Sequence, residues 1–210
     1  LGEHSASGFP GEQSGYLPRY KDDALFKATL SFGHGLTVNS IQLARAYAVI
    51  ANHGVKQPIS LLRLADQSVV SEARTTDVVS SATADEVLRL MQGVAETGGT
   101  GIKAAIKGYS VAGKTGTTHK VGDLGYEGSR YRASFAGIVP ASSPRLVAIV
   151  TIDDPAGDHY FGGDVAAPVF SRVMASALRL MNIPSDRVDQ IGVSQLKTAS
   201  QQAYERSKTN

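Results

Sequence analysis

The 210-residue chain carries 21 lysines and arginines against 19 aspartates and glutamates, a formal net charge of +2 that is too small to indicate a nucleic-acid partner. Hydrophobic residues make up 42% and charged residues 19%, which favours one globular domain and argues against a disordered chain. The absence of cysteine excludes disulfides and thiolate metal sites, and the longest apolar run, residues 146–150, is far shorter than a membrane-spanning helix.

The first part of the chain predicts one clear helix after a polar segment. Residues 1–23 are rich in glycine, serine and proline and are typical of an extended loop, whereas residues 24–32 fit either a short helix or a strand. Through residues 37–52, apolar side chains recur at three- and four-residue spacing, which predicts a helix. Thr37 is its expected N-terminal cap, and Gly54 suits its exit.

The middle of the chain adds a strand and a second helix. Residues 58–64 have the composition of a strand. The spacing of Thr83 and Glu86 is that of a capping box, which predicts a helix that runs to about Glu96 and ends at Gly98 and Gly99.

The second half predicts an antiparallel sheet followed by a helix. Three strand candidates lie close together, at residues 109–117, 132–139 and 145–153. Short turns with Pro140 and Pro144 join the last two and favour a hairpin, while the glycine-rich residues 118–130 are typical of a mobile surface loop. A final helix is expected at residues 165–181, with an apolar face formed by Val169, Val173, Ala177 and Leu180.

These elements predict an α+β fold, an antiparallel sheet with helices packed on it. We expect the folded part to cover residues 1–181 and residues 182–210 to form a polar, poorly ordered tail.

Residues 108–115 match the nucleotide-binding template G-x-x-x-x-G-K-[ST], and the apolar strand at 146–153 ends in an acid that could be its partner. Such a loop requires a helix to begin at the lysine, because the amides of the helix N-terminus bind the phosphates. Four glycines follow Thr115 within a short stretch, and each costs about 1 kcal/mol in a helix relative to alanine. Nucleotide binding is therefore the disfavoured interpretation.

A second interpretation takes Lys114-Thr115-Gly116-Thr117 as a K-T-G strand, an element of the serine acyl-enzymes that bind β-lactams. A lysine and a hydroxyl offer charge-assisted hydrogen bonds to a substrate carboxylate, and glycine lets a ligand backbone approach closely. Simple alternation places Lys114 and Thr115 on opposite faces, so both reach one ligand only if it lies at the edge of the strand. On this motif alone, an ordinary strand with a solvated lysine stays open.

Seven segments of the sequence occur in an order and at a spacing shared with one enzyme family. They are residues 8–12, 29–35, 41–44, 114–117, 136–137, 160–163 and 167–170. From residue 2 to about 181 the chain thereby resembles the end of the transpeptidase domain of septal class B penicillin-binding proteins, with most similarity to the penicillin-binding protein 3 group of Gram-negative bacteria. This resemblance favours the K-T-G interpretation and implies a β-lactamase-like fold that is incomplete in this chain.

The resemblance implies an enzyme that attacks the D-Ala-D-Ala end of a peptidoglycan stem peptide through a serine acyl-enzyme, which β-lactams trap. It implies that Lys114 supports catalysis, that Thr115 and Thr117 bind the carboxylate, and that the Thr117 amide contributes to the oxyanion hole. For Tyr160 and Phe161 it implies an aromatic wall, with core packing as an equal alternative. The expected substrate-binding residues are Lys114, Thr115, Gly116, Thr117, Tyr160 and Phe161.

The family's S-x-x-K and S-x-N elements, which include the nucleophilic serine, are expected upstream of Leu1. The chain alone is therefore predicted not to acylate, and to need the preceding segment in order to fold well. Ser194 and Lys197 have S-x-x-K spacing, but they follow the K-T-G strand in the polar tail, and we interpret the match as coincidence. The absence of a first methionine also indicates a piece of a longer protein.

By the same resemblance, the partners are stem peptides, β-lactams and division-complex proteins at the periplasmic face of the inner membrane, reached through an anchor that this chain lacks. No cofactor is expected. Asp153, Asp154, Asp158 and His159 could hold a hard metal ion, but a solvated turn is the favoured interpretation. Two other functions stay open: a serine β-lactamase or D,D-carboxypeptidase, and an inactive penicillin-binding-like scaffold module.

Overall fold

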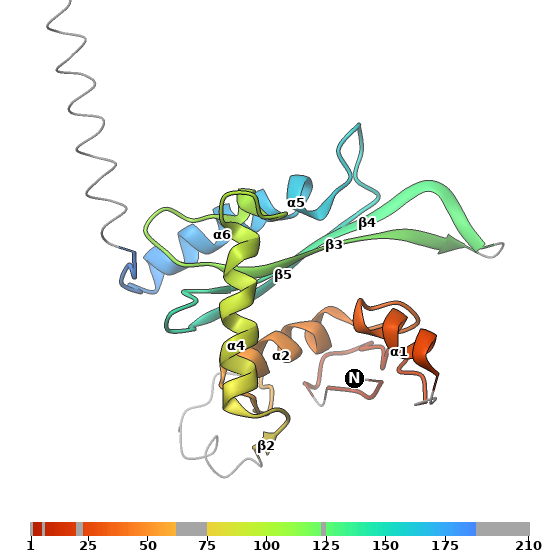
Figure 1. Ribbon diagram of the computed structural model, residues 1–210, viewed down its shortest axis with the longest axis horizontal. Helices are drawn as coiled ribbons and strands as arrows, with labels where there is room; N and C mark the ends of the chain where they lie inside the picture. The colour runs from red at the N-terminus through yellow and green to blue at the C-terminus, as the bar shows by residue number, and fades with distance from the viewer. Residues whose placement is uncertain (1, 6, 20–22, 62–74, 123–124, 188–210) are drawn as a thin grey trace, which may run out of the picture. The chain divides into compact units, whose positions relative to one another are not determined.

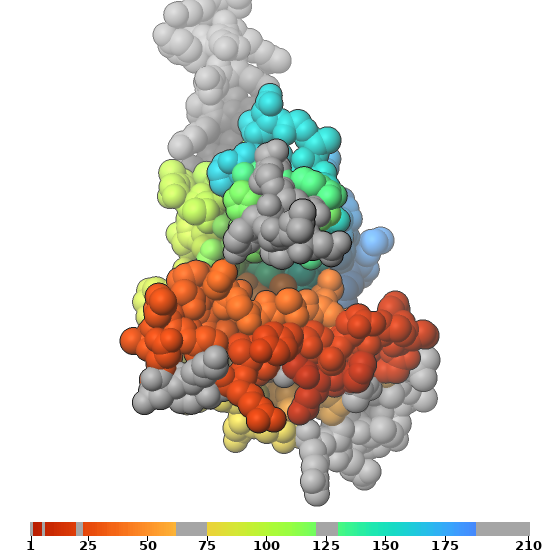
Figure 2. Space-filling view, turned by 90° about the vertical axis from the view of Figure 1, so that its right-hand side faces the viewer, coloured from red at the N-terminus to blue at the C-terminus, as the bar shows by residue number. Residues whose placement is uncertain are grey.

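The computed structural model describes residues 2–5, 7–19, 23–61, 75–122 and 125–187. The chain forms two compact units, Leu1–Ala84 and Asp85–Asn210, where length alone favoured one domain. Figure 2 distinguishes them by colour, from red to yellow for the first unit and from yellow-green to blue for the second. Among the described residues, no helix has the length and apolar character that crossing a membrane requires.

In its described residues the first unit contains two complete helices and a two-stranded antiparallel ladder. Its elements are α1 (Ala24–Ser31), α2 (Ser40–Ala51), β1 (Val55–Lys56) and β2 (Thr76–Asp77). The segment at 24–32 is therefore helical, and Asp23 caps it by accepting a hydrogen bond from the Leu25 amide at 2.9 Å. The strand predicted at 58–64 is wrong in its described part, because residues 58–61 form no strand, and residues 62–64 lie outside the described residues.

The N-terminal cap of α2 is Asn39, so the prediction of Thr37 was wrong. The Asn39 side chain accepts from the Gln42 amide at 2.7 Å, and the Gln42 side chain accepts from the Asn39 amide at 3.0 Å. This reciprocal capping box satisfies two donors that the helix itself leaves free, and asparagine caps helices at least as well as threonine. At the other end Gly54 allows the predicted exit, with a φ of +88°.

A cluster of hydrogen bonds around Glu12 fixes the polar segment that precedes the helices. The Glu12 carboxylate accepts from the Ser5 amide and hydroxyl at 2.8 Å each, and from the Ser7 hydroxyl and the Asn39 side chain at 3.1 Å each. Burial opposes ionisation of this carboxyl, but the donors outweigh burial and lower the pKa of Glu12 to about 2. Side chains, together with one backbone bridge between Tyr16 and Thr37, therefore hold this segment.

Over the residues that the structure describes, the second unit is a three-stranded antiparallel sheet with helices packed on one face, which confirms the predicted α+β class (Figure 1). The strands, in the order β3–β4–β5, are β3 (Ala112–Gly122), β4 (Gly125–Val139) and β5 (Leu146–Asp153). The helical elements are α4 (Ser81–Gln92), which begins in the first unit, η1 (Gly93–Ala95), η2 (Ile102–Ala104), α5 (Gly162–Val165) and α6 (Ala167–Leu180).

Two boundaries in this part differ from the sequence prediction. Residues 118–130 were expected to form a loop, but β3 and β4 extend into this stretch as a hairpin, with a register irregularity between His119 and Val121. The helix expected to begin near Thr83 begins at Ser81, because the Ser80 hydroxyl accepts from the Thr83 amide at 3.2 Å and so provides the cap.

The core of the second unit lies between the sheet and α6. Phe135 of β4 and Phe170 of α6 are fully buried, with their ring centroids 4.9 Å apart. Two paired glycines make room for these rings. A Cβ atom on Gly113 would lie 2.4 Å from the Phe135 ring, and one on Gly137 would lie 2.5 Å from the Phe170 ring. Glycine is required in both strands because the two aromatic rings occupy the space of a side chain.

The apolar face predicted for the last helix was one residue out of register. The buried residues of α6 are Ala167, Phe170, Met174 and Leu178. Val173 and Leu180, which were predicted to face the core, are 52% and 84% exposed. The spacing of the apolar residues predicts a helix, but these residues occupy more than one side of α6. The face that is buried is the one that carries Phe170, which packs against the sheet.

Residues 182–187, which the sequence analysis assigned to the tail, are bonded to the segment that leads into β3. The Ser110 amide donates to the Asp186 carboxylate at 2.8 Å, and the hydroxyls of Ser110 and Ser142 donate to the same carboxylate. The Tyr109 hydroxyl donates to the Ile183 carbonyl at 2.7 Å. The remaining tail, residues 188–210, lies outside the described residues.

Replacing Asp186 by asparagine is expected to lower the free energy of unfolding by about 1–2 kcal/mol at pH 7, because an amide nitrogen would face the serine donors. Partial burial opposes ionisation of Asp186, but the three serine donors hold its pKa below the usual value. The contribution is therefore complete above the unfolded-state pKa, about 3.9, and is lost as the pH falls through the folded-state value. Urea unfolding of both proteins at pH 7 and pH 3 measures this, and an equal difference at both pH values contradicts it.

Candidate functional site

The segment Lys114-Thr115-Gly116-Thr117 is extended backbone within β3. Lys114 lies opposite Ala136 of β4, and in the described part of the chain β3 pairs with β4 alone. The other edge of β3 is therefore free of a strand partner among these residues. No helix begins at Lys114, which agrees with the rejection of the nucleotide-binding interpretation.

The side chains of this segment alternate between the two faces of the sheet, as predicted. Thr115 and Thr117 lie on the face that carries α5, whereas a Cβ atom on Gly116 would point the other way and lie 2.5 Å from the Ser134 hydroxyl. Lys114 is exposed, and its ammonium donates to the Thr115 carbonyl at 2.9 Å. The lysine side chain is long enough to bring its charge back to the backbone of Thr115, although the Thr115 hydroxyl lies on the opposite face of the sheet.

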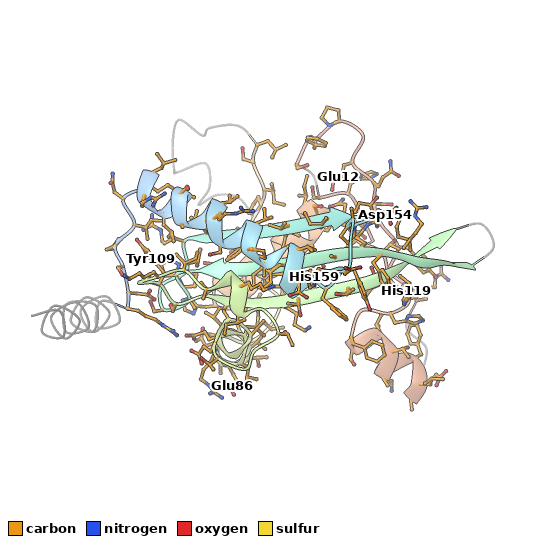
Figure 3. All side chains as sticks on the ribbon, turned by 90° about the horizontal axis from the view of Figure 1, so that it is seen from above. Glu12, Glu86, Tyr109, His119, Asp154 and His159 are labelled. Atoms are coloured by element: carbon orange, nitrogen blue, oxygen red, sulfur yellow. The ribbon has the colours of Figure 1, made fainter. Side chains whose placement is uncertain are left out.

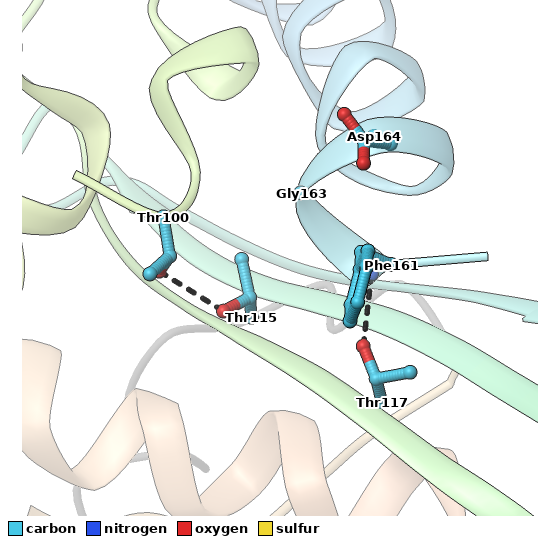
Figure 4. Close-up of a pocket in the computed structure, with 7 residues that line it drawn as sticks. Thr100, Thr115, Thr117, Phe161, Gly163 and Asp164 are labelled. Atoms are coloured by element: carbon cyan, nitrogen blue, oxygen red, sulfur yellow. Dashed lines mark hydrogen bonds between the residues drawn. The ribbon is translucent and has the colours of Figure 1, made fainter. Parts of the chain in front are cut away.

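A cavity of about 300 Å³ lies beside β3 on the α5 face (Figure 4). Its lining residues are Thr100, Thr115, Thr117, Phe161, Gly162, Gly163 and Asp164. Both strand hydroxyls are hydrogen-bonded at this wall. The hydroxyls of Thr100 and Thr115 lie 3.1 Å apart, and the Gly162 amide donates to the Thr117 hydroxyl at 3.1 Å.

The turn at α5 sits close to the strands because it begins with two glycines. A Cβ atom on Gly162 would lie 2.2 Å from the Ser134 carbonyl oxygen, and one on Gly163 would lie 2.0 Å from the Thr100 carbonyl oxygen. Next to them, the Asp164 carboxylate accepts from the Lys103 ammonium at 2.7 Å. The hydrogen bond from Lys103 lowers the pKa of Asp164, so the wall of the cavity carries an ion pair at neutral pH.

Tyr160 and Phe161 belong to a row of four neighbouring rings, of which one pair is stacked and two pairs are tilted. Tyr131 stacks on Tyr160 with centroids 4.1 Å apart, Phe161 lies 4.5 Å from Tyr160, and His119 lies 4.5 Å from Tyr131. Phe161 is 55% exposed and lines the cavity, whereas Tyr160 is half-buried between neighbouring rings. Of the two aromatic residues that were predicted to form one wall, only Phe161 lines the cavity, whereas Tyr160 packs among other rings.

A group of charged residues lies at the end of the sheet where Figure 3 labels His119, Asp154 and His159. Asp153 accepts from Lys120 at 3.0 Å and from Arg132 at 3.1 Å, and these cations lower its pKa. Among the described side chains, no group of three or more potential ligands is arranged to hold a metal ion. Asp153 and Asp154 are therefore paired with cations of the chain itself.

The sequence predicted the strand side of the cavity and, on the opposite side, Phe161, but none of the other residues there. The sequence does contain a signal for Gly162 and Gly163, because residues 160–163 form one of the segments shared with the family. No sequence signal pointed to Thr100 or Asp164, because they belong to no motif and line the cavity beside β3 only in the folded chain.

Comparison with known proteins gives a consistent match. Residues 1–175 match the family described as the penicillin binding protein transpeptidase domain. Peptidoglycan D,D-transpeptidase FtsI of Escherichia coli (strain K12) is 44% identical over 189 residues, which are 89% of this chain and 31% of that protein. The probable peptidoglycan D,D-transpeptidase PenA of Neisseria flavescens is 39% identical over 184 residues, 87% of this chain and 45% of that protein.

A solved structure, the apo TP domain of Burkholderia pseudomallei penicillin-binding protein 3, is similar with a TM-score of 0.79 at 39% identity. The match covers 89% of this chain and 56% of that one. The chain thus spans less than half the length of the two curated relatives and just over half of this structure.

Proposed function

The chain belongs to the transpeptidase domain family of penicillin-binding proteins, in its FtsI-like class B branch, and on that premise we propose that it is the substrate-binding part of a peptidoglycan D,D-transpeptidase that acts in cell division. The observation that supports this most directly is the edge of β3 that has no strand partner in the described residues. Thr115 and Thr117 line a cavity of substrate-group size there, and the Lys114 ammonium reaches the backbone of the same strand. Such an edge can pair with an extended peptide as an added strand.

The residues at this edge suit the end of a stem peptide. The carboxylate of a terminal D-alanine takes charge-assisted hydrogen bonds from the Lys114 ammonium and hydrogen bonds from the Thr115 and Thr117 hydroxyls. The Thr117 amide donates to the oxygen of the scissile carbonyl as negative charge develops there. Phe161 provides an apolar wall for the ligand at the other side of the cavity.

The nucleophile of this reaction is a serine of an S-x-x-K element that we place outside these 210 residues. Its hydroxyl oxygen attacks the carbonyl carbon of the penultimate D-alanine and forms an ester as the peptide C–N bond breaks. The serine proton passes to the nitrogen of the terminal D-alanine, which leaves. An amine of a neighbouring stem then attacks the ester, forms the cross-link and returns a proton to the serine oxygen. A β-lactam forms the same ester but has no separate leaving group, which keeps the serine blocked.

The test is covalent labelling by a fluorescent penicillin. We expect no labelling of the 210-residue chain alone, and stable labelling of the polypeptide that joins it to its preceding S-x-x-K and S-x-N segments. That polypeptide should also release D-alanine from a stem pentapeptide. An intact serine without labelling contradicts the proposal, rapid penicillin hydrolysis favours a β-lactamase, and a preceding segment without the serine favours the inactive scaffold.

The same family membership supports a cellular setting. We propose that the protein works at the periplasmic face of the inner membrane, held by an N-terminal anchor outside this chain, in contact with division-complex proteins. Fractionation of cells that express the whole protein, with co-purification of bound division proteins, tests both parts of this proposal.

A further inference from the structure

The hydroxyl of Thr117 has a defined direction in the cavity wall. A threonine hydroxyl donates one hydrogen bond and accepts up to two. At Thr117 the Gly162 amide donates to the oxygen at 3.1 Å and so occupies an acceptor position. The hydroxyl hydrogen points elsewhere, and it is available to an acceptor that enters the cavity. The Gly162 amide therefore makes Thr117 a donor toward a ligand.

The hydroxyl of Thr115 is controlled in the same way by another side chain. Its oxygen lies 3.1 Å from the hydroxyl oxygen of Thr100, and either of the two can be the donor. When Thr100 donates, the hydrogen of Thr115 is free to face the cavity. An anion in the cavity favours this arrangement because it accepts and never donates, so Thr100 can turn Thr115 into a second donor.

Several contacts hold Thr100 at this distance from β3. The absence of a side chain at Gly163 admits the Thr100 carbonyl, because a Cβ atom there would lie 2.0 Å from its oxygen. The Gly101 amide donates to the Val94 carbonyl at 2.9 Å, and the Lys103–Asp164 ion pair joins the same segment to α5. Thr100 thus lies on a braced turn rather than on a free loop.

We propose that Thr100 is a positioning residue that, together with the Gly162 amide, directs the two threonine hydroxyls of β3 as donors and so makes the cavity select a carboxylate over a neutral carboxamide. This inference rests on the proposed function and adds the residue that sets its ligand selectivity. Thr100 acts through Thr115 and needs no contact with the reacting atoms.

The test compares two ligands that differ only in charge, a stem peptide ending in the D-Ala-D-Ala carboxylate and the same peptide with a C-terminal amide. Each competes with the fluorescent penicillin for the whole polypeptide, and the ratio of the two inhibition constants measures the selectivity. Thr100→Val keeps the shape of the side chain and removes the hydroxyl. It is expected to lower the selectivity by about 2- to 12-fold, the range for one neutral hydrogen bond.

Two further variants separate positioning from structure. Thr100→Ser keeps the hydroxyl and is expected to retain the wild-type selectivity. Thr97→Val makes the same change at an exposed residue three positions earlier and is expected to leave it unchanged. Should thermal unfolding show that Thr100→Val is destabilised, Thr100→Ala supplies the same readout without the branched methyl groups.

The outcomes distinguish this inference from the function on which it rests. Equal weakening of both ligands in Thr100→Val, or unchanged selectivity, overturns the positioning role while the proposed function stands. A wild-type protein that binds the amide as well as the carboxylate contradicts the proposed carboxylate site itself.

Discussion

Replacing Lys114 by methionine is expected to slow acylation by a fluorescent penicillin by about 10- to 100-fold, because a hydrogen bond to a charged group contributes about 1.5–3 kcal/mol. Methionine keeps the unbranched chain and removes the ammonium that reaches the backbone edge of β3. The measurement is the second-order rate constant of labelling of the polypeptide that contains the S-x-x-K segment, from a time course at several penicillin concentrations.

Two other variants make the result specific to the site. Lys107→Met removes an equal charge from an exposed residue that precedes β3, and it is expected to label at the wild-type rate. Lys114→Arg retains the charge in a planar group and is expected to fall between wild type and Lys114→Met. Equal rates for Lys114→Met and Lys107→Met would show that the ammonium at the β3 edge takes no part in binding.

The extended conformation of Lys114-Thr115-Gly116-Thr117 could be predicted because it depends on residues close together in the sequence. The glycines after Thr115 disfavoured a helix, and the alternation of an extended chain placed Lys114 and Thr115 on opposite faces, as the structure confirms. The length of β3 was missed. Residues 118–122 are mostly polar and end in glycine, so composition alone indicated a loop rather than an extension of the strand.

The partners of the strand hydroxyls could not be predicted. Thr100 is 15 residues from Thr115 in the sequence, and Gly162 is 45 residues from Thr117. A single sequence carries periodicity and turn preferences over short distances, but it does not state which distant segments meet. The donor directions that underlie ligand selectivity are therefore a property of the folded chain.

Helix ends show a smaller version of the same limit. Thr37 and Asn39 are both capable caps, and so are Ser80 and Thr83. In each pair the sequence analysis chose the wrong member by two or three residues. Both candidates offer an acceptor oxygen, and the choice depends on where the first turn packs rather than on the chemistry of the cap.

Replacing Phe170 by alanine is expected to lower the free energy of unfolding by about 3–5 kcal/mol, the largest change that we expect for one side chain of the second unit. The ring is fully buried, packs 4.9 Å from Phe135 and fills the space left by Gly137, so its removal leaves a cavity that rigid strands cannot close. Urea unfolding of the polypeptide that includes the preceding segments, followed by far-UV circular dichroism, measures the change.

The matched control is Val173→Ala on the same helix, which decides between the two possible buried faces of α6. Val173 is 52% exposed, and a substitution at such a position is expected to change the free energy of unfolding by no more than about 0.5 kcal/mol. The face predicted from spacing alone requires the opposite order, because it places Val173 in the core. A larger loss for Val173→Ala than for Phe170→Ala would mean that α6 packs on the sheet with its other side, and that Gly137 is not there to admit an aromatic ring.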